Sequence, residues 1–72
     1  MTEAELHALR ADAVDKYAIY IESEMKLWQE KDGFANLQLY KAFKKAKTAF
    51  HAANGKWEDA LLEYVSDSFK QD

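Results

Sequence analysis

A seven-residue repeat of large aromatic side chains runs through the second half of this 72-residue chain. Its members are Phe43, Phe50, Trp57 and Tyr64. A column of alanines follows three residues later, at Ala46, Ala53 and Ala60. Side chains that recur every seven residues lie along one face of an α-helix, and alanines there let a facing helix approach closely while the rings pack beside it. The repeat predicts a long helix in a coiled-coil-like pair.

The first half of the chain predicts the other helix of that pair. Thr2 followed by Glu5 is a capping box, in which a hydroxyl and a carboxylate each accept a hydrogen bond from a free backbone N–H group. The apolar residues that follow fall within an arc of about 160° on a helix: Leu6, Leu9, Ala13, Val14, Tyr17, Tyr20, Ile21, Met25, Leu27 and Trp28. Lys31 and Gly33 are typical of a last turn and a left-handed stop residue. A first helix is therefore expected over about residues 2–32.

Asn54 and Gly55 interrupt the second half in composition but not in phase. One interpretation is a break, with Gly55 as a C-cap and Glu58 and Asp59 in the first turn of a third helix. A resemblance favours it: the segment GKWEDALLEY, residues 55–64, is similar to the turn and second-helix opening of a tetratricopeptide repeat. The resemblance covers about a seventh of the chain and implies no functional residue, and 72 residues are too few for an array of such repeats.

The departures from that repeat lie on both sides of the similar segment. Lys44, Lys47 and Thr48 stand upstream where the repeat has apolar residues of defined size, and Asp67 stands downstream where it has alanine. The other interpretation is a helix that continues through Gly55, because a turn would have no reason to preserve the heptad phase, and an interior glycine costs only about 1 kcal/mol. We favour this second interpretation.

Composition agrees with an all-α fold. The chain has no proline and only two glycines, which are the residues that most often interrupt helices and form turns. It also has no cysteine, so no disulfide can support the fold. We expect one helical domain over residues 1–72, a long antiparallel hairpin with helices over about 2–32 and 35–69. The alternative is three helices with a break at Asn54 and Gly55.

Two helices cannot cover the apolar surface of this chain. An arc of about 160° is wider than one neighbouring helix covers, and each of the ten aromatic side chains can bury about 150–250 Å². We expect a homodimer that forms a four-helix bundle. The half of the hairpin near its closing turn, residues 17–55, carries a net charge of +2, and the remaining half carries −5. An antiparallel dimer places these unlike halves together.

The residues expected at the interface are mostly aromatic. They are Tyr17, Tyr20, Glu24, Trp28, Phe43, Phe50, Trp57 and Tyr64. Glu24 is the exception, since it falls within the apolar arc and needs a cation there. A lysine of the second helix, in the same chain or in a second copy, is the expected partner. Ile19 and Leu37 point away from the apolar faces and indicate a second surface for an outside protein.

A lysine-rich segment suggests a function of another class. Residues 34–55 contain four lysines and no acid, and two aromatic residues lie among them. The candidate nucleic-acid face is Tyr40, Lys41, Lys44, Lys45 and Lys47, with Phe43 between them. Lysines would contact phosphates and rings would stack on bases. An acidic pI of 5.3 and a single arginine, Arg10, disfavour this alternative.

Patterns of catalysis and cofactor binding are missing from the sequence. It has no cysteine, no glycine-rich phosphate loop and no Gly-x-Ser-x-Gly motif. His7 and His51 are the only imidazoles, and Glu3 with His7 supplies at most two ligands where zinc or di-iron sites need three or four. We expect no enzyme, no metal site and no cofactor.

The same reading extends to location and partners. The longest apolar run, residues 17–21, is too short to span a membrane, and acidic residues stand where a secretory signal carries positive charge. A cytoplasmic protein is expected. Its expected partners are a second copy of itself and an unidentified protein, with no membrane and no small-molecule substrate.

Overall fold

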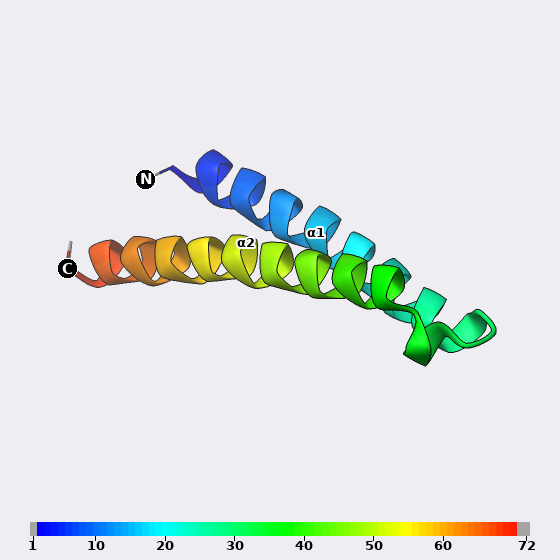
Figure 1. Cartoon of the computed structure of the whole chain (residues 1–72). Helices are drawn as coiled ribbons and strands as arrows, with labels where there is room; N and C mark the ends of the chain where they lie inside the picture. Colours follow the sequence, from blue (N-terminus) through cyan, green and yellow to red (C-terminus); the bar gives the residue numbers. More distant parts are fainter. Residues whose placement is uncertain (1, 71–72) are drawn as a thin grey trace.

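Two antiparallel helices make up most of the chain in a computed structural model that describes residues 2–70. Helix α1 spans Glu3–Gln29, a short 3-10 helix η1 spans Gly33–Ala35, and α2 spans Leu37–Lys70. The helices lie side by side and return the chain to the end where it began (Figure 1). The molecule measures 58 × 15 × 13 Å. The predicted all-α hairpin is confirmed.

Helix α2 continues through Asn54 and Gly55 without a break. The Asn54 side-chain amide donates to a Glu58 carboxylate oxygen at 3.1 Å, one turn further along the same helix, and Gly55 has no positive φ. Ala53 and Ala60, on either side of Gly55, are both buried, and a turn between them would break the register that places both against α1. The three-helix alternative, and the turn implied by the tetratricopeptide-like segment, are therefore wrong.

The closing turn differs from its prediction in two respects. Helix α1 ends at Gln29, three residues before the expected end, and the N–H group of the extended residue Glu30 donates to the Lys26 carbonyl at 3.1 Å. The left-handed residue is Asp32, with φ of 58°, and Gly33 has no positive φ. Aspartate is one of the few residues that adopt this conformation readily.

Gly33 is needed in the turn for its lack of a side chain. It is buried, and a Cβ atom built on it would lie 2.3 Å from the carbonyl oxygen of Leu27. The turn thus folds back onto the last part of α1. The sequence analysis identified Gly33 as a turn residue and attributed its role to a left-handed backbone conformation. In the structure, Gly33 is needed because the turn backbone approaches the Leu27 carbonyl group closely.

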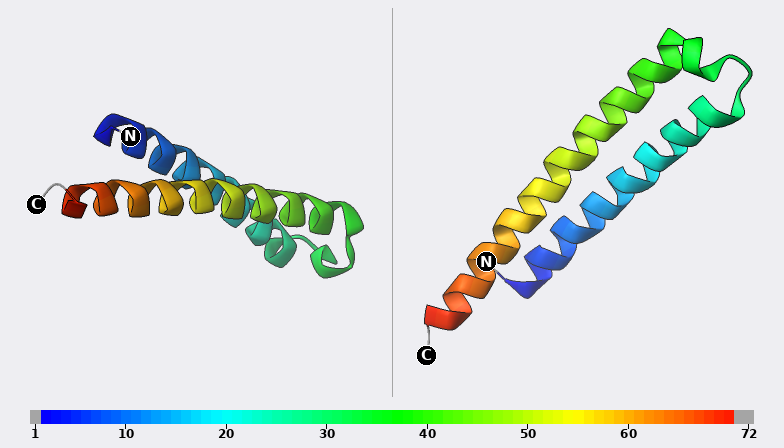
Figure 2. Two further views of the ribbon diagram at one scale, coloured as in Figure 1. Left: turned by 90° about the vertical axis from the view of Figure 1, so that its left-hand side faces the viewer. Right: turned by 90° about the horizontal axis from the view of Figure 1, so that it is seen from below.

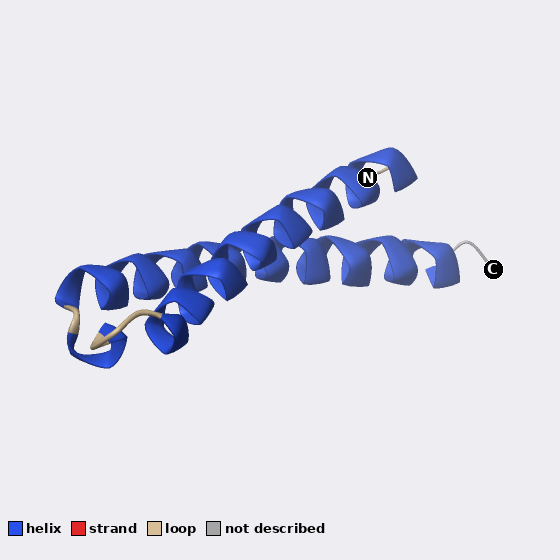
Figure 3. Cartoon of the chain, turned by 90° about the vertical axis from the view of Figure 1, so that its right-hand side faces the viewer, coloured by secondary structure: helices blue, strands red, loops and turns tan. Residues whose placement is uncertain are grey.

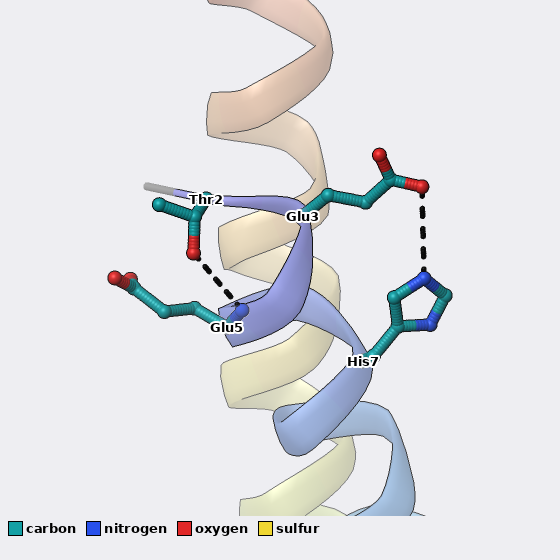
Figure 4. Close-up of polar contacts among 4 residues, drawn as sticks. All are labelled: Thr2, Glu3, Glu5 and His7. Carbon is teal, nitrogen blue, oxygen red and sulfur yellow. Dashed lines mark hydrogen bonds and ion pairs between the residues drawn. The ribbon is translucent and has the colours of Figure 1, made fainter.

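Both helices begin at a side-chain cap. The Glu5 N–H group donates to the Thr2 hydroxyl at 3.2 Å, which is the Thr2 part of the predicted capping box (Figure 4). The side-chain oxygen of Asn36 accepts from the N–H groups of Gln38 and Leu39 at 3.0 and 3.2 Å. These bonds satisfy donors that have no partner inside a helix and so define where each helix starts.

We expect replacement of Asn36 by alanine to lower the free energy of unfolding by about 1 kcal/mol, because two N–H groups of α2 lose their acceptor. Urea unfolding followed by circular dichroism at a fixed protein concentration measures the change. Asn36→Asp keeps a side-chain oxygen in place and is the matched control. Equal stability of the alanine and aspartate variants would show that the cap does not hold the start of α2.

Most of the buried side chains at the contact between the two helices are alanines. The buried residues are Leu6 and Ala13 of α1 and Ala46, Ala53 and Ala60 of α2. The predicted alanine column therefore faces α1, and the helices cross and diverge toward their free ends (Figure 3). The core of a single chain is thin, because the only residues that it buries among those described are one leucine, four alanines and Gly33 of the closing turn.

Helix α2 is longer than α1 and extends beyond it at the end of the molecule where α1 begins. It has 34 residues and α1 has 27, and its last turns continue past the start of α1 (Figure 2). Val65 and Phe69 lie in this overhang and are exposed. No neighbouring helix of the same chain covers them.

Candidate protein interaction face

Four aromatic rings form a cluster at the middle of the hairpin. The Tyr17 and Phe50 ring centroids are 5.1 Å apart in an edge-on contact, and the Tyr20 ring stacks on Phe50 at 5.8 Å. Phe43 completes the cluster at 5.6 Å from Tyr20. Offset and edge-on contacts at these separations are favourable. Half of the predicted interface residues thus come together, from both helices.

The cluster continues toward the termini through Arg10. Its guanidinium lies 4.8 Å from the centre of the Trp57 ring, which is a cation–π contact. Arg10 and Trp57, with Leu6, His7 and Tyr64, line a shallow groove between the helix ends. Sequence reasoning did not name Arg10 as an interface residue, although it stands seven residues before Tyr17 and so shares the heptad spacing that could have identified it.

Trp28 lies apart from these rings. It packs edge-on against Phe34 of η1 with ring centroids 4.9 Å apart, and 70% of Trp28 is exposed. The pair caps the turn end of the hairpin on the outside. Phe34 was also missed from the sequence, because its position in the closing turn gave it no helical phase.

The rings and the residues beside them define one side of the hairpin, which we call the aromatic flank. Two grooves on this side are lined by Arg10, Val14 and Tyr17 of α1 and by Phe50, Trp57 and Tyr64 of α2. Helical phase adds Ile21, Glu24 and Trp28 on α1 and Phe43 and Lys47 on α2. Val14 and Tyr17 are 47% and 48% exposed. Helix α2 therefore leaves much of the apolar arc of α1 in contact with solvent. The opposite flank holds a groove between Ile19 of α1 and Ala49 of α2.

Glu24 lies half-buried on the aromatic flank, and its predicted ion pair does not form inside the chain. Among the side chains of residues 2–69 every ion pair joins residues four apart on α1: Glu3 with His7, Asp12 with Lys16 and Glu22 with Lys26. The expected pair inside the chain is wrong for the lysines from Lys41 to Lys56, because none of them lies within ion-pair distance of Glu24. A pair across two chains stays a prediction.

The five residues of the candidate nucleic-acid face do not all lie on the same side of α2. Tyr40, Lys41, Lys44 and Lys45 share a shallow groove on the outer side of α2. Lys47 does not line it; it is half-buried, and its position three residues before Phe50 places it on the aromatic flank. Three lysines and one ring therefore remain together, which is a smaller basic patch than the sequence indicated.

The imidazole–carboxylate pair near the N-terminus lies in the open. A His7 ring nitrogen is 3.6 Å from a Glu3 carboxylate oxygen (Figure 4), and both side chains are mostly exposed. Among the residues that the structure describes, no third histidine, cysteine or acid joins such a group to make a metal site.

Comparison with models of protein families, with curated proteins and with solved structures found no match. In the described part of the chain, neither helix combines the length and the apolar character that crossing a membrane requires. The fold and the exposed rings define the class: an all-helical hairpin with one flank rich in partly covered aromatic side chains.

Proposed function

We propose that this protein is a small, non-enzymatic helical interaction module that self-associates through its aromatic flank and binds a protein partner. Two hairpins pack flank to flank and form a four-helix bundle. The observation that carries the proposal is the exposure of the rings: each of the ten aromatic residues is half-buried or exposed, and none is fully buried.

The surface area of the chain supports a second copy. The hairpin exposes 5620 Å², whereas a compact monomer of 8.3 kDa exposes about 4,600 Å². The excess of about 1,000 Å² is close to the ~800 Å² that each partner buries in a standard interface. The radius of gyration agrees, at 16.5 Å against about 11 Å for a compact domain of this length.

The remaining exposed apolar residues give the dimer an outer surface for the protein partner. Ile19 and Leu37 are 54% and 61% exposed and lie away from the aromatic flank. Helix α2 adds Leu62 on its outer side and Phe69 in its overhang, and both are exposed. Apolar side chains that stay uncovered after self-association are the contacts that we assign to this partner.

We expect the protein to sediment as a dimer of twice 8.3 kDa at tens of micromolar. Tyr17→Ser should weaken dimerisation at least about tenfold, because a ring at the centre of the interface is lost. Analytical ultracentrifugation over a concentration series measures both.

Ile19→Ser is the matched control for this experiment. Ile19 is 54% exposed and Tyr17 is 48% exposed, but Ile19 lines the groove on the opposite flank. Its loss should leave dimerisation unchanged. Circular dichroism establishes that both variants keep their helices. A monomeric wild-type protein, or equal effects of the two substitutions, would contradict the proposal.

A further inference from the structure

Helix α1 carries a second heptad seam besides the one that faces α2. The seam consists of residues spaced alternately four and three apart, which is the spacing of a helix that packs in a coiled coil. Its members are Arg10, Val14, Tyr17, Ile21, Glu24 and Trp28. All are half-buried or exposed, so α2 leaves this seam without a full partner.

The two charges of the seam are opposite and are placed symmetrically. Arg10 stands seven residues before Tyr17, and Glu24 stands seven residues after it. Each lies about 10.5 Å from Tyr17 along the helix axis. Neither makes an ion pair with another side chain of residues 2–69. When two copies of this seam run antiparallel, the positive position of each copy lies opposite the negative position of the other.

We propose, resting on the self-association proposed above, that the two-fold axis of the dimer passes beside Tyr17 and that α1 packs antiparallel against α1 of the second copy. Arg10 then lies opposite Glu24 of the partner subunit, and Glu24 lies opposite the partner's Arg10. The half-buried Glu24 receives a cation without any rearrangement of its own chain. Val14 meets the partner's Ile21 between the charges.

Helix α2 accommodates the same axis. Tyr17 contacts Phe50, so an axis beside Tyr17 also passes beside Phe50, and α2 lies antiparallel to its own copy. Lys47 then approaches the partner's Asn54, whose side chain holds a Glu58 carboxylate at 3.1 Å within its own helix. A lysine on this flank therefore meets a neutral amide, with the Glu58 carboxylate one helical turn beyond it, and not a second lysine.

The net charge of the two halves favours this arrangement over a parallel dimer. The half near the closing turn carries +2 and the half near the termini carries −5. An antiparallel dimer places unlike halves together at both ends, whereas a parallel dimer places two halves of −5 side by side. Repulsion of that kind disfavours the wrong geometry.

Charge reversal tests the register. Arg10→Glu alone and Glu24→Arg alone should each weaken dimerisation about tenfold or more, because every dimer then contains two pairs of like charges. The double variant, Arg10→Glu with Glu24→Arg, should recover most of the loss. Lys41→Glu changes the net charge as much as Arg10→Glu does, but on the outer side of α2, and should have little effect. Failure of the double variant to recover would overturn the register.

Distances between spin labels test it without altering the seam. Ala18→Cys and Lys31→Cys place labels at exposed positions, one near the proposed axis and one at the closing turn. In the antiparallel dimer the labels at residue 18 are close, and those at residue 31 are about 40 Å apart along the axis, since each is fourteen residues from Tyr17. Short distances at both positions would overturn the register but leave self-association intact, whereas a wild-type monomer would overturn both.

Discussion

Replacement of Gly33 by alanine is expected to destabilise the hairpin by about 3 kcal/mol. The new methyl group would lie 2.3 Å from the Leu27 carbonyl oxygen, and neither group is the flexible end of a side chain. The turn has to move away from α1 to make room. Thermal and urea unfolding at a fixed protein concentration measure the loss, since the stability of a self-associating protein depends on its concentration.

Gly55 is the matched control, because the same substitution there should have the opposite sign. Gly55 lies inside α2, and nothing stands within 4 Å of an added Cβ atom. Alanine at an open helical position stabilises by about 1 kcal/mol relative to glycine. A loss of stability in Gly55→Ala would contradict the continuous helix, and an unchanged Gly33→Ala variant would contradict the close approach in the turn.

Ala13→Leu is expected to cost about 3 kcal/mol or more, through the separation of the helices. Ala13 is completely buried, at 0% exposure. Tyr17 faces Phe50 and Arg10 faces Trp57, so Ala13 lies between these levels, where the helices meet through small side chains. An added isobutyl group has no space there, and overpacking of this kind is destabilising.

The control for this variant lies on the same helix. Ala8 is exposed, and Ala8→Leu should change stability by less than about 0.5 kcal/mol. Both variants are compared by urea unfolding, and near-ultraviolet circular dichroism reports whether the aromatic cluster beside Ala13 is disturbed. Equal stabilities would mean that the helices have room to spare at Ala13.

The heptad spacing explains why so much of the fold could be predicted. A strict repeat from Phe43 to Tyr64 requires one uninterrupted helix, because only a helix keeps such side chains on one face. That argument outweighed the local signals at Asn54 and Gly55, and α2 is continuous. The start of the first helix was predictable from its cap, Thr2. The second helix begins at Leu37, two residues after the expected start, behind a cap, Asn36, that the sequence analysis did not identify.

The closing turn was harder to predict, because its conformation depends on contacts between segments. Whether Asp32 or Gly33 adopts the left-handed conformation depends on which of the two residues lies close to α1. The distance between the turn and α1 cannot be derived from the sequence. The same limit applies to Glu24. Its place in the apolar arc was readable from its phase, but whether a lysine of α2 reaches it depends on how far apart the helices lie at that level.

The candidate flank was predicted for its rings and for Glu24, and its two cations were missed. Tyr17, Phe50 and Trp57 followed from size and spacing. Arg10 and Lys47 were overlooked, because a charged residue on a helix is usually solvated, and their placement beside rings appears only once the two helices are aligned.

The unequal lengths of the helices have a consequence for how the proposed dimer meets other molecules. Each overhang of α2 carries exposed Val65 and Phe69 beyond the start of α1. In an antiparallel dimer these projections point in opposite directions from the two ends of a rod whose single hairpin is already 58 Å long. Such a dimer would hold two identical targets at its two ends, at a fixed distance from each other. Its two α2 overhangs could not both contact the same site.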